Sequence, residues 1–370
     1  MIFNLFKNLL NENHENHENY ENNKVNENNK VNENKENNEN NIYENNTNIN
    51  DNESNDYISS NSSISLTSLD GIIEDIEINS YFDILKEKGY VIIPDVYNEK
   101  EIETYIDEFN DWREKIVDID HLHNIIDYNG IYKHHQIGHQ RFAWLARTNP
   151  KILNIFKKLW NTDELVCSFD GCCFYPNTCN DTPHYWTHTD QSSLKKGIHC
   201  YQSFLSLTNN KERTMIIYEG THKHHESYFE TMNIIEPRDW NIIDKEYLFK
   251  NHIEKQRFLN VNAGDLVIWD SRTFHQSTPG SHDCNEERLV QYLCYLPKNN
   301  IGNSNKEKNN RKKFFDKKRT TNHWPYPMNP VPEQPNMYNY YNDNNPIYID
   351  YDKLPIPYLD DLLEDINKLL

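Results

Sequence analysis

Eight short segments rich in β-branched and aromatic residues follow one another between residues 165 and 295, separated by polar turns. They are Leu165–Phe169, Cys172–Tyr175, His184–His188, Ile198–Leu207, Met215–Tyr218, Phe258–Val261, Asp265–Trp269 and Arg288–Tyr295. Segments of this length and composition are typical of strands. Many short strands with polar connections favour two packed sheets. We therefore predict a jelly-roll or cupin-like core.

Helical patterns flank this strand-rich region. Before it, apolar residues recur at helical spacing over 99–112 and 150–160, and a helix over 81–89 ends at a glycine and leads into a strand at 90–94. After it, we expect a basic helix over 311–319 and an amphipathic helix over 359–370. The predicted fold class is mainly β with flanking helices, of the α+β type.

The first part of the chain has a different composition. Residues 11–50 contain 19 Asn and 9 Glu, and a Ser-rich stretch follows at 59–68. Such sequence cannot bury enough apolar surface to offset the entropy of ordering it. We therefore expect a disordered tail over 1–75, one enzyme-sized domain over 76–297, and an extension over 298–370 that packs on that domain.

Charge and cysteine content narrow the function classes. Residues 1–56 hold four Lys and twelve Asp or Glu, so −12 of the chain's net charge of −20 remains for the rest. An acidic domain argues against binding a phosphate backbone. Seven cysteines without a CxxC motif indicate free thiols in a reducing compartment. We expect neither a signal peptide nor a membrane span, and a cytoplasmic location by default.

The candidate chemistry begins at His188-Thr189-Asp190. Residues i and i+2 of a strand point to the same face, so this imidazole and carboxylate can bind one cation. His275 follows another predicted strand, 87 residues beyond His188. Two His and one Asp from two strands form the facial triad typical of non-haem Fe(II) oxygenases, which leaves metal positions open for an oxo acid and O₂.

Two further residues suit the oxo acid. Arg288 opens the next strand, 13 residues after His275, and offers a planar two-pronged donor to a carboxylate. Ser277, two residues after His275, can supply a second hydrogen bond. Gln202 lies on an alternating strand and points either toward the same space or away from it.

These residues resemble a known family, the phytanoyl-CoA dioxygenase-like branch of the Fe(II)/2-oxoglutarate-dependent oxygenases. The resemblance covers roughly residues 80–297. Its motifs are His188-Thr189-Asp190-Gln191-Ser192, His275-Gln276-Ser277, Arg288, the strand Gly89–Pro94, the turn Gly220-Thr221-His222-Lys223 and the strand Gly264–Trp269. It implies a double-stranded β-helix in which His188, Asp190 and His275 bind iron while Arg288 and Ser277 bind 2-oxoglutarate.

The resemblance also implies a reaction. In such enzymes 2-oxoglutarate and O₂ yield succinate and CO₂ while a substrate C–H bond is hydroxylated, with ascorbate as an accessory reductant. Related halogenases lack the carboxylate ligand, so Asp190 favours hydroxylation. The expected partners are O₂ and a small-molecule or lipid-like substrate, without nucleic acid. The sequence predicts no oligomeric state.

Some residues depart from the family pattern. The segment 209–214 replaces a Gly-rich loop, and Glu219 replaces a proline. We expect both at the mouth of the pocket, where they affect substrate choice. The family's CoA-ester substrates are therefore not carried over, and the basic segment 306–319 is interpreted as a solvated helix face.

Other histidines and other functions remain as alternatives. His135 and His139 have helical metal-pair spacing, His121 and His123 have strand spacing, and His222 with its neighbours can line the pocket rim. Surface or core roles are favoured for the first two pairs. The rival functions are a non-catalytic metal-binding scaffold and a nucleic-acid oxygenase.

Overall fold

The computed structural model describes residues 66–117, 119–120, 129–179, 181–251, 253, 256–335 and 348–370, with side chains from residue 77 onward. The chain divides into two units, 1–63 and 64–370. The first unit lies outside the described residues, and so does most of the predicted tail. Helix α2 begins at Leu66, inside the predicted tail, so the domain boundary at residue 76 stays a prediction.

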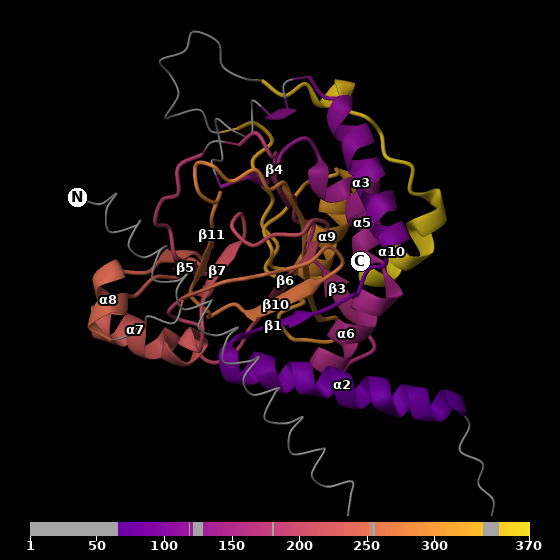
Figure 1. Cartoon of the computed structure of the whole chain (residues 1–370). Helices are drawn as coiled ribbons and strands as arrows, with labels where there is room; N and C mark the ends of the chain where they lie inside the picture. Colours follow the sequence, from indigo (N-terminus) through magenta and orange to yellow (C-terminus); the bar gives the residue numbers. More distant parts are fainter. Residues whose placement is uncertain are drawn as a thin grey trace, which may run out of the picture. The chain divides into compact units, whose positions relative to one another are not determined.

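Two antiparallel sheets form the centre of the second unit (Figure 1). The larger has the order β1-β10-β6-β12-β4-β2, with β3 also paired to β12, and the smaller has the order β8-β5-β11-β7-β9. The strands of the larger sheet are β1 Tyr90–Ile93, β2 Ile131–Tyr132, β3 Leu165–Cys167, β4 Cys172–Tyr175, β6 Tyr201–Ser206, β10 Leu266–Asp270 and β12 Arg288–Pro297. Those of the smaller sheet are β5 His188–Thr189, β7 Met215–Tyr218, β8 Asn241–Ile242, β9 Gln256–Phe258 and β11 His275–Ser277. This architecture confirms the predicted double-sheet fold.

Helices cover the outer faces of both sheets. Those that pack with the larger sheet and its core are α2 Leu66–Lys88, α3 Glu99–Glu114, α5 Arg141–Arg147, α6 Pro150–Trp160, α9 Asn305–Asp316 and α10 Leu363–Leu369. Helices α7 His225–Met232 and α8 Lys245–Lys250 pack on the smaller sheet. Single 3-10 turns occur at Ile137–His139, Thr221–His224, Tyr351–Lys353 and Asp360–Leu362.

Local sequence signals explain where the principal helices begin and end. Asn149 caps α6 by accepting hydrogen bonds from the backbone N–H groups of Lys151 and Ile152, and proline occupies the first helical position. Gly89 ends α2 with φ 82°, and a Cβ there would lie 2.4 Å from Nδ1 of His222. The Gly89 carbonyl accepts from the backbone N–H of Asp270, which brings β1 beside β10.

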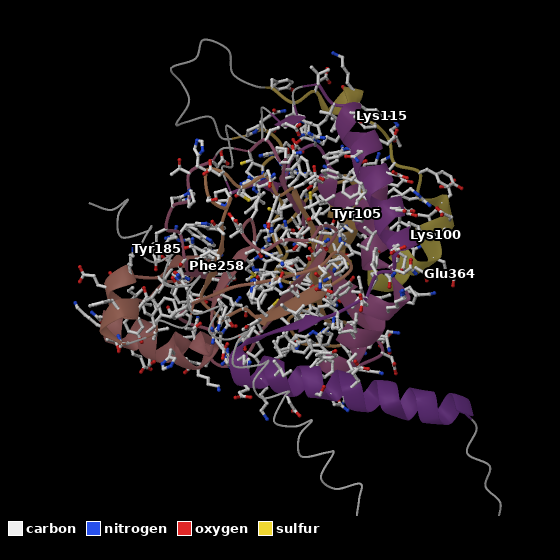
Figure 2. All side chains as sticks on the ribbon, viewed as in Figure 1. Lys100, Tyr105, Lys115, Tyr185, Phe258 and Glu364 are labelled. Atoms are coloured by element: carbon white, nitrogen blue, oxygen red, sulfur yellow. The ribbon has the colours of Figure 1, made fainter. Side chains whose placement is uncertain are left out.

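Strand β12 separates the main core from the space between the sheets. Its side chains alternate, so Leu289, Leu293 and Tyr295 join the core under the helices. Arg288 and Tyr292 line the cavity between the sheets. In Figure 2, Tyr105 lies among the packed side chains while Lys100, Lys115 and Glu364 lie at the outside. The Tyr105 hydroxyl donates to Gln291 Oε1 at 2.7 Å, which ties α3 to β12.

The C-terminal extension belongs to the same packed unit. Phe314 of α9 and Ile366 and Leu369 of α10 are buried in the core of the larger sheet. The basic segment 306–319 is divided by burial: Arg311 is fully buried and donates to Asn303 Oδ1 and to the Pro325 carbonyl, whereas Lys306, Lys308, Lys312 and Lys313 are exposed. Its lysines therefore lie on a solvated helix face.

Candidate metal centre

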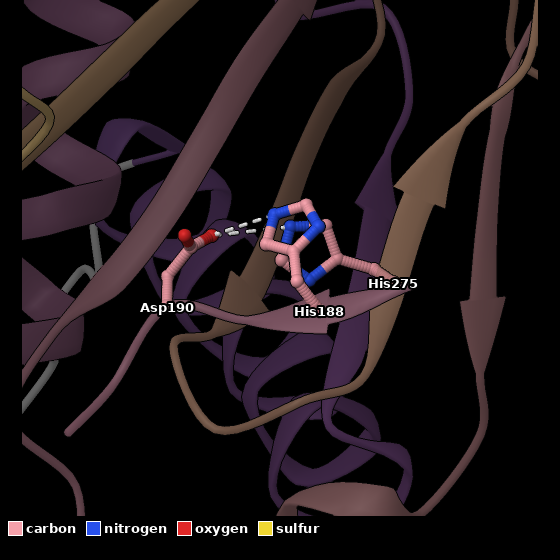
Figure 3. A group of neighbouring side chains, drawn as sticks. All are labelled: His188, Asp190 and His275. Carbon is pink, nitrogen blue, oxygen red and sulfur yellow. Dashed lines mark ion pairs between the residues drawn. The ribbon is translucent and has the colours of Figure 1, made fainter. Parts of the chain in front are cut away.

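Three residues of metal-ligand type meet between the sheets. His188 on β5 and His275 on β11 are directly paired across the two strands, and Asp190 follows the end of β5. Their ligand atoms lie within 4.8 Å of one another, and all three side chains are buried. Asp190 Oδ2 is 3.5 Å from Nε2 of His188 and 3.2 Å from Nε2 of His275 (Figure 3). This is the one such cluster among the described residues.

Backbone contacts orient both imidazoles. Nδ1 of His188 lies 3.1 Å from the Trp186 carbonyl, and Nδ1 of His275 lies 2.9 Å from the Thr273 carbonyl. A neutral ring that donates from Nδ1 to a carbonyl presents the lone pair of Nε2. Both lone pairs then face Asp190, which is the tautomer and direction needed to bind a cation.

The electrostatics match this arrangement. Burial lowers the pKa of His275, aided by the neighbouring His188, so its imidazole is neutral at neutral pH. Burial raises the pKa of Asp190, but without a metal the charge of a protonated His188 and the hydrogen bonds that Asp190 accepts from His188 and His275 outweigh this and hold it well below its usual range. Neutral imidazole and ionised carboxylate are the forms that bind transition metals.

Two of the three ligand pairs have a spacing close to that of an octahedral ion. Cis ligands bound at about 2.1 Å lie about 3 Å apart, because they subtend a right angle at the metal. The two separations from Asp190 Oδ2, 3.5 and 3.2 Å, come close to that value. The donor set of two nitrogens and one oxygen suits non-haem Fe(II).

The residues predicted for the oxo acid lie in the same cavity. It measures about 700 Å³, and His188, Asp190, His275, Ser277 and Arg288 all line it. Arg288 is buried, donates from one terminal nitrogen to Cys173 Sγ at 3.0 Å and lies over the Phe204 ring, but its Nε has no partner. The Ser277 hydroxyl is also buried without a partner. Buried polar atoms in folded proteins are nearly always satisfied, so these two donors, on residues that line one cavity, are available to an acceptor there.

Aromatic side chains form much of the cavity wall. Four of the chain's seven tryptophans line it, namely Trp186, Trp240, Trp269 and Trp324. Trp186 stacks on the His188 ring with 4.8 Å between centroids. Gln202 also lines the cavity, with Nε2 unpartnered, so it points inward.

The sequence analysis missed one wall of the cavity. Asp170, between β3 and β4, lines it together with several residues of the C-terminal extension. These are Thr321, Asn322, His323, Trp324, Pro327, Asn329 and Val331. No periodicity or motif marks this segment, and its role depends on tertiary contact with a loop about 150 residues earlier.

The alternative histidine sites are not metal centres in the described structure. His139 lies in a 3-10 turn, with Nε2 3.0 Å from the Arg319 carbonyl, and its ring packs against Trp144 and Phe169. His135 has a left-handed backbone, so the alternative of a helical metal pair does not form and the favoured core role holds. His121 and His123 lie outside the described residues.

One expectation about the pocket mouth, the placement of segment 209–214 and Glu219 there, is wrong, and the alternative role of His222 and its neighbours at the rim is not observed either. His222 and His225 face the backbone carbonyls of Lys86 and Gln191, and they do not line the cavity. The segment 209–214 does not line it either, because Arg213 turns inward as a support. Its buried guanidinium donates to five backbone carbonyls, those of Pro176, Cys179, Pro279, Cys284 and Glu286. Glu219 accepts from Arg257 and is likewise not part of the wall.

Two antiparallel sheets enclosing a buried His/Asp/His cluster define the class of double-stranded β-helix proteins with a metal centre. Residues 85–284, just over half of the chain, match the phytanoyl-CoA dioxygenase (PhyH) family. The chain belongs to this family. It is therefore a 2-oxoglutarate-dependent non-haem iron enzyme, which confirms the predicted family, enzyme class and use of iron and 2-oxoglutarate.

Individual proteins are similar over comparable lengths. "Ava biosynthesis cluster protein O" of Aspergillus versicolor is 28% identical over 242 residues, covering 58% of this chain and 77% of its own. Among solved structures, the epimerase SnoN in complex with Fe3+, alpha ketoglutarate and nogalamycin RO has a TM-score of 0.42 at 16% identity, covering 60% of this chain and 84% of that one. HygX from Streptomyces hygroscopicus, with nickel and 2-oxoglutarate bound, has a TM-score of 0.41 at 13% identity, covering 59% and 86%.

Two further findings concern the described residues. All seven cysteines are free, and all but Cys179 are buried, as the absence of a disulfide framework predicted. No described helix combines the length and the apolar character that crossing a membrane requires. The cytoplasmic location stays a prediction.

Proposed function

We propose that this chain hydroxylates a C–H bond of a small-molecule substrate, with His188, Asp190 and His275 as the iron ligands. The observation that carries the proposal is the convergence of two oriented Nε2 atoms on one buried carboxylate. When bound, Fe(II) with 2-oxoglutarate and O₂ supplies the oxidation that turns C–H into C–OH while succinate and CO₂ form. Asp190 supports hydroxylation because it holds the position that halogenases leave to a halide.

We assign Arg288 and Ser277 to the far carboxylate of 2-oxoglutarate. The support is their position: both line the cavity that holds the His/Asp/His cluster, and each has a buried donor without a partner. A guanidinium buried beside the Phe204 ring favours a negatively charged group, because few other groups repay its desolvation. The assignment also gives the acidic chain a local positive site for a dianion.

The cavity supports a small substrate rather than a CoA ester. Its volume of about 700 Å³ lies in the range of small-molecule sites. Three cations line it: Lys133, Arg238 and Arg288. Arg238 is paired with Glu236, Lys133 has an interaction of its own and Arg288 is assigned to the oxo acid, so the described wall offers little to several phosphates.

An assay of iron binding and succinate release tests the proposal. The wild-type protein, supplied with Fe(II), 2-oxoglutarate and ascorbate, is expected to bind one iron and to release succinate during a screen of small natural products, amino acids and acyl esters. Asp190→Ala is expected to abolish turnover by removing a ligand. Asp283→Ala is the control, because this acid is exposed and lies outside the cavity wall.

Full activity in Asp190→Ala would refute the metal assignment. Iron binding without succinate release from any substrate would instead favour the rival metal-binding scaffold. Salt-sensitive binding of single-stranded nucleic acid would favour the nucleic-acid oxygenase.

A further inference from the structure

A second polar group of residues faces the cavity from the wall that the C-terminal extension forms. Asp170 lies on the turn between β3 and β4, and His323 lies in the segment after α9. The family match ends at residue 284, so His323 comes from sequence outside it. Neither residue has a role in the proposed binding of iron or 2-oxoglutarate.

Asp170 is a buried carboxyl group with an unsatisfied oxygen. Its side chain is 6% exposed, and Oδ1 has no hydrogen-bond partner. Burial raises the pKa of Asp170 even though the buried Arg147 guanidinium and a hydrogen bond from the Ser168 side chain oppose the rise. Arg147 directs its own hydrogen bonds to backbone carbonyls, those of Gly138 and of Asp170 itself. A buried oxygen without a partner is destabilising, so Oδ1 of Asp170 is free to accept from a donor in the cavity.

His323 completes the group from the other side. Its Nε2 is buried and unpartnered, and the residue lines the same cavity as Asp170 and Asp190. An imidazole nitrogen can donate or accept a hydrogen bond. His323 can therefore pair with a hydroxyl group or accept from an ammonium group.

Backbone hydrogen bonds fix this arrangement. The Thr321 N–H donates to the Phe169 carbonyl at 3.0 Å, and the Phe169 N–H donates to the Thr321 hydroxyl oxygen at 3.0 Å. These reciprocal bonds join the residue before Asp170 to the start of the extension's wall. Trp324, the residue after His323, is also fixed: Nζ of Lys195 lies over its ring, 3.7 Å from the ring centre. The group is thus built into the fold rather than carried on a free loop.

We infer that Asp170 and His323 bind a hydrogen-bond donor group, hydroxyl or ammonium, on a small substrate with a ring body. The ring would pack against the tryptophans of the wall, which present flat apolar faces. Anchoring one end of the substrate at Asp170 leaves a C–H bond at the other end directed toward His188, Asp190 and His275. The orientation of the C–H bond rests on the proposed hydroxylation, whereas the binding of the donor group at Asp170 and His323 does not.

Three ring compounds that differ in one group test the inference: benzylamine, benzyl alcohol and toluene. Their affinities are measured on the anaerobic Fe(II) and 2-oxoglutarate complex by quenching of tryptophan fluorescence, since four tryptophans line the cavity. In the wild type, at least one donor compound is expected to bind about tenfold or more tightly than toluene, the effect of one charge-assisted hydrogen bond.

Variants then assign the preference to residues. Asp170→Ala is expected to remove it, and His323→Ala to weaken it. Asp170→Asn keeps an acceptor but drops the charge, so it is expected to lose a preference for benzylamine and to keep one for benzyl alcohol. Asp283→Asn is the control and is expected to keep the wild-type preference, because this carboxylate is exposed and lies outside the cavity wall. Thermal unfolding checks that each variant is folded.

Two results would overturn the inference: equal affinity of the wild type for all three compounds, or an unchanged preference in Asp170→Ala. Binding of 2-oxoglutarate, measured by calorimetry in the same variants, separates this from the proposed function. If the wild type fails to bind 2-oxoglutarate with Fe(II), the proposed function fails whatever the ring compounds do. If it binds 2-oxoglutarate normally but shows no donor preference, the subsite alone is wrong.

Discussion

A buried guanidinium with an unsatisfied nitrogen is the most informative single residue of the cavity. Arg288 is 2% exposed. Its guanidinium contacts the Cys173 thiol and the Phe204 ring, neither of which is a carboxylate that could balance its charge. Desolvating a charge without a counter-charge is costly, so such a residue persists where a ligand supplies the counter-charge. The argument for an anionic cosubstrate thus rests on this chain's own energetics as well as on family membership.

At this scale we predict the effect of shortening Arg288. Arg288→Ala is expected to raise the apparent KM for 2-oxoglutarate by about 10- to 100-fold, since a hydrogen bond between charged groups contributes about 1.5–3 kcal/mol. The contact is made before and during the reaction, so kcat should change much less than KM. Steady-state succinate release against 2-oxoglutarate concentration measures both constants.

The conservative variant sharpens this test. Arg288→Lys keeps the charge but loses the planar fork, so it should recover only part of the affinity. An unchanged KM in Arg288→Ala would mean that another residue holds the carboxylate.

At the scale of elements, the metal cluster depends on the pairing of two very short strands. Strand β5 has two residues and β11 has three, with His188 opposite His275. Gln276 reinforces this pairing: its Oε1 accepts from the Trp186 N–H at 3.2 Å and from the Thr187 hydroxyl at 2.6 Å. Its Nε2 donates to the His184 carbonyl. One side chain therefore fixes the segment that precedes His188.

We predict that Gln276→Leu weakens iron binding without removing a ligand. Loss of these hydrogen bonds should free the segment that orients His188 and lower the affinity for Fe(II) by about 10- to 100-fold, the usual effect of removing such supporting contacts. Anaerobic titration with Fe(II) measures it. Gln276→Glu, which keeps the acceptor oxygens, should retain more of the affinity. Wild-type affinity in Gln276→Leu would show that the strand pairing alone suffices.

The helices and strands also show which parts of the fold could be predicted from the sequence. Strand β4 and helix α6 have the predicted bounds, because each carries a complete local signal: a β-branched or aromatic run, or a cap with proline and an apolar face. Segment 184–188 was predicted as a strand, but only His188 of it is strand. Hydrogen bonds from the Gln276 side chain fix residues 184–187 instead, and no local sequence pattern predicts these hydrogen bonds.

The candidate site divides in the same way. His188, Asp190, His275, Ser277 and Arg288 were predictable because strand geometry and fixed chemistry link them. The structure brings all five to one cavity. Asp170 and His323 were not predictable, because their meeting depends on the contact between Phe169 and Thr321 across the fold.

At the scale of the whole molecule, buried neutral histidines make stability depend on pH. Three of them lie together in sequence, and burial lowers the pKa of His134 and of His135 to about 4 and that of His139 to about 3. The ordinary value in an unfolded chain is about 6.5. Between those values the unfolded chain binds protons that the folded protein does not, so stability falls as pH falls.

We therefore predict acid sensitivity that one substitution reduces. Each such histidine lowers the free energy of unfolding by up to about 1.4 kcal/mol per pH unit below about pH 6. His139→Gln removes one proton site and keeps a donor for the Arg319 carbonyl, so its stability should fall less steeply by about that slope. Urea unfolding at several pH values between about 6 and 4 measures it. His282→Gln, at an exposed histidine, is the control and should follow the wild type. If His139→Gln also follows the wild type, protons taken up elsewhere govern acid unfolding.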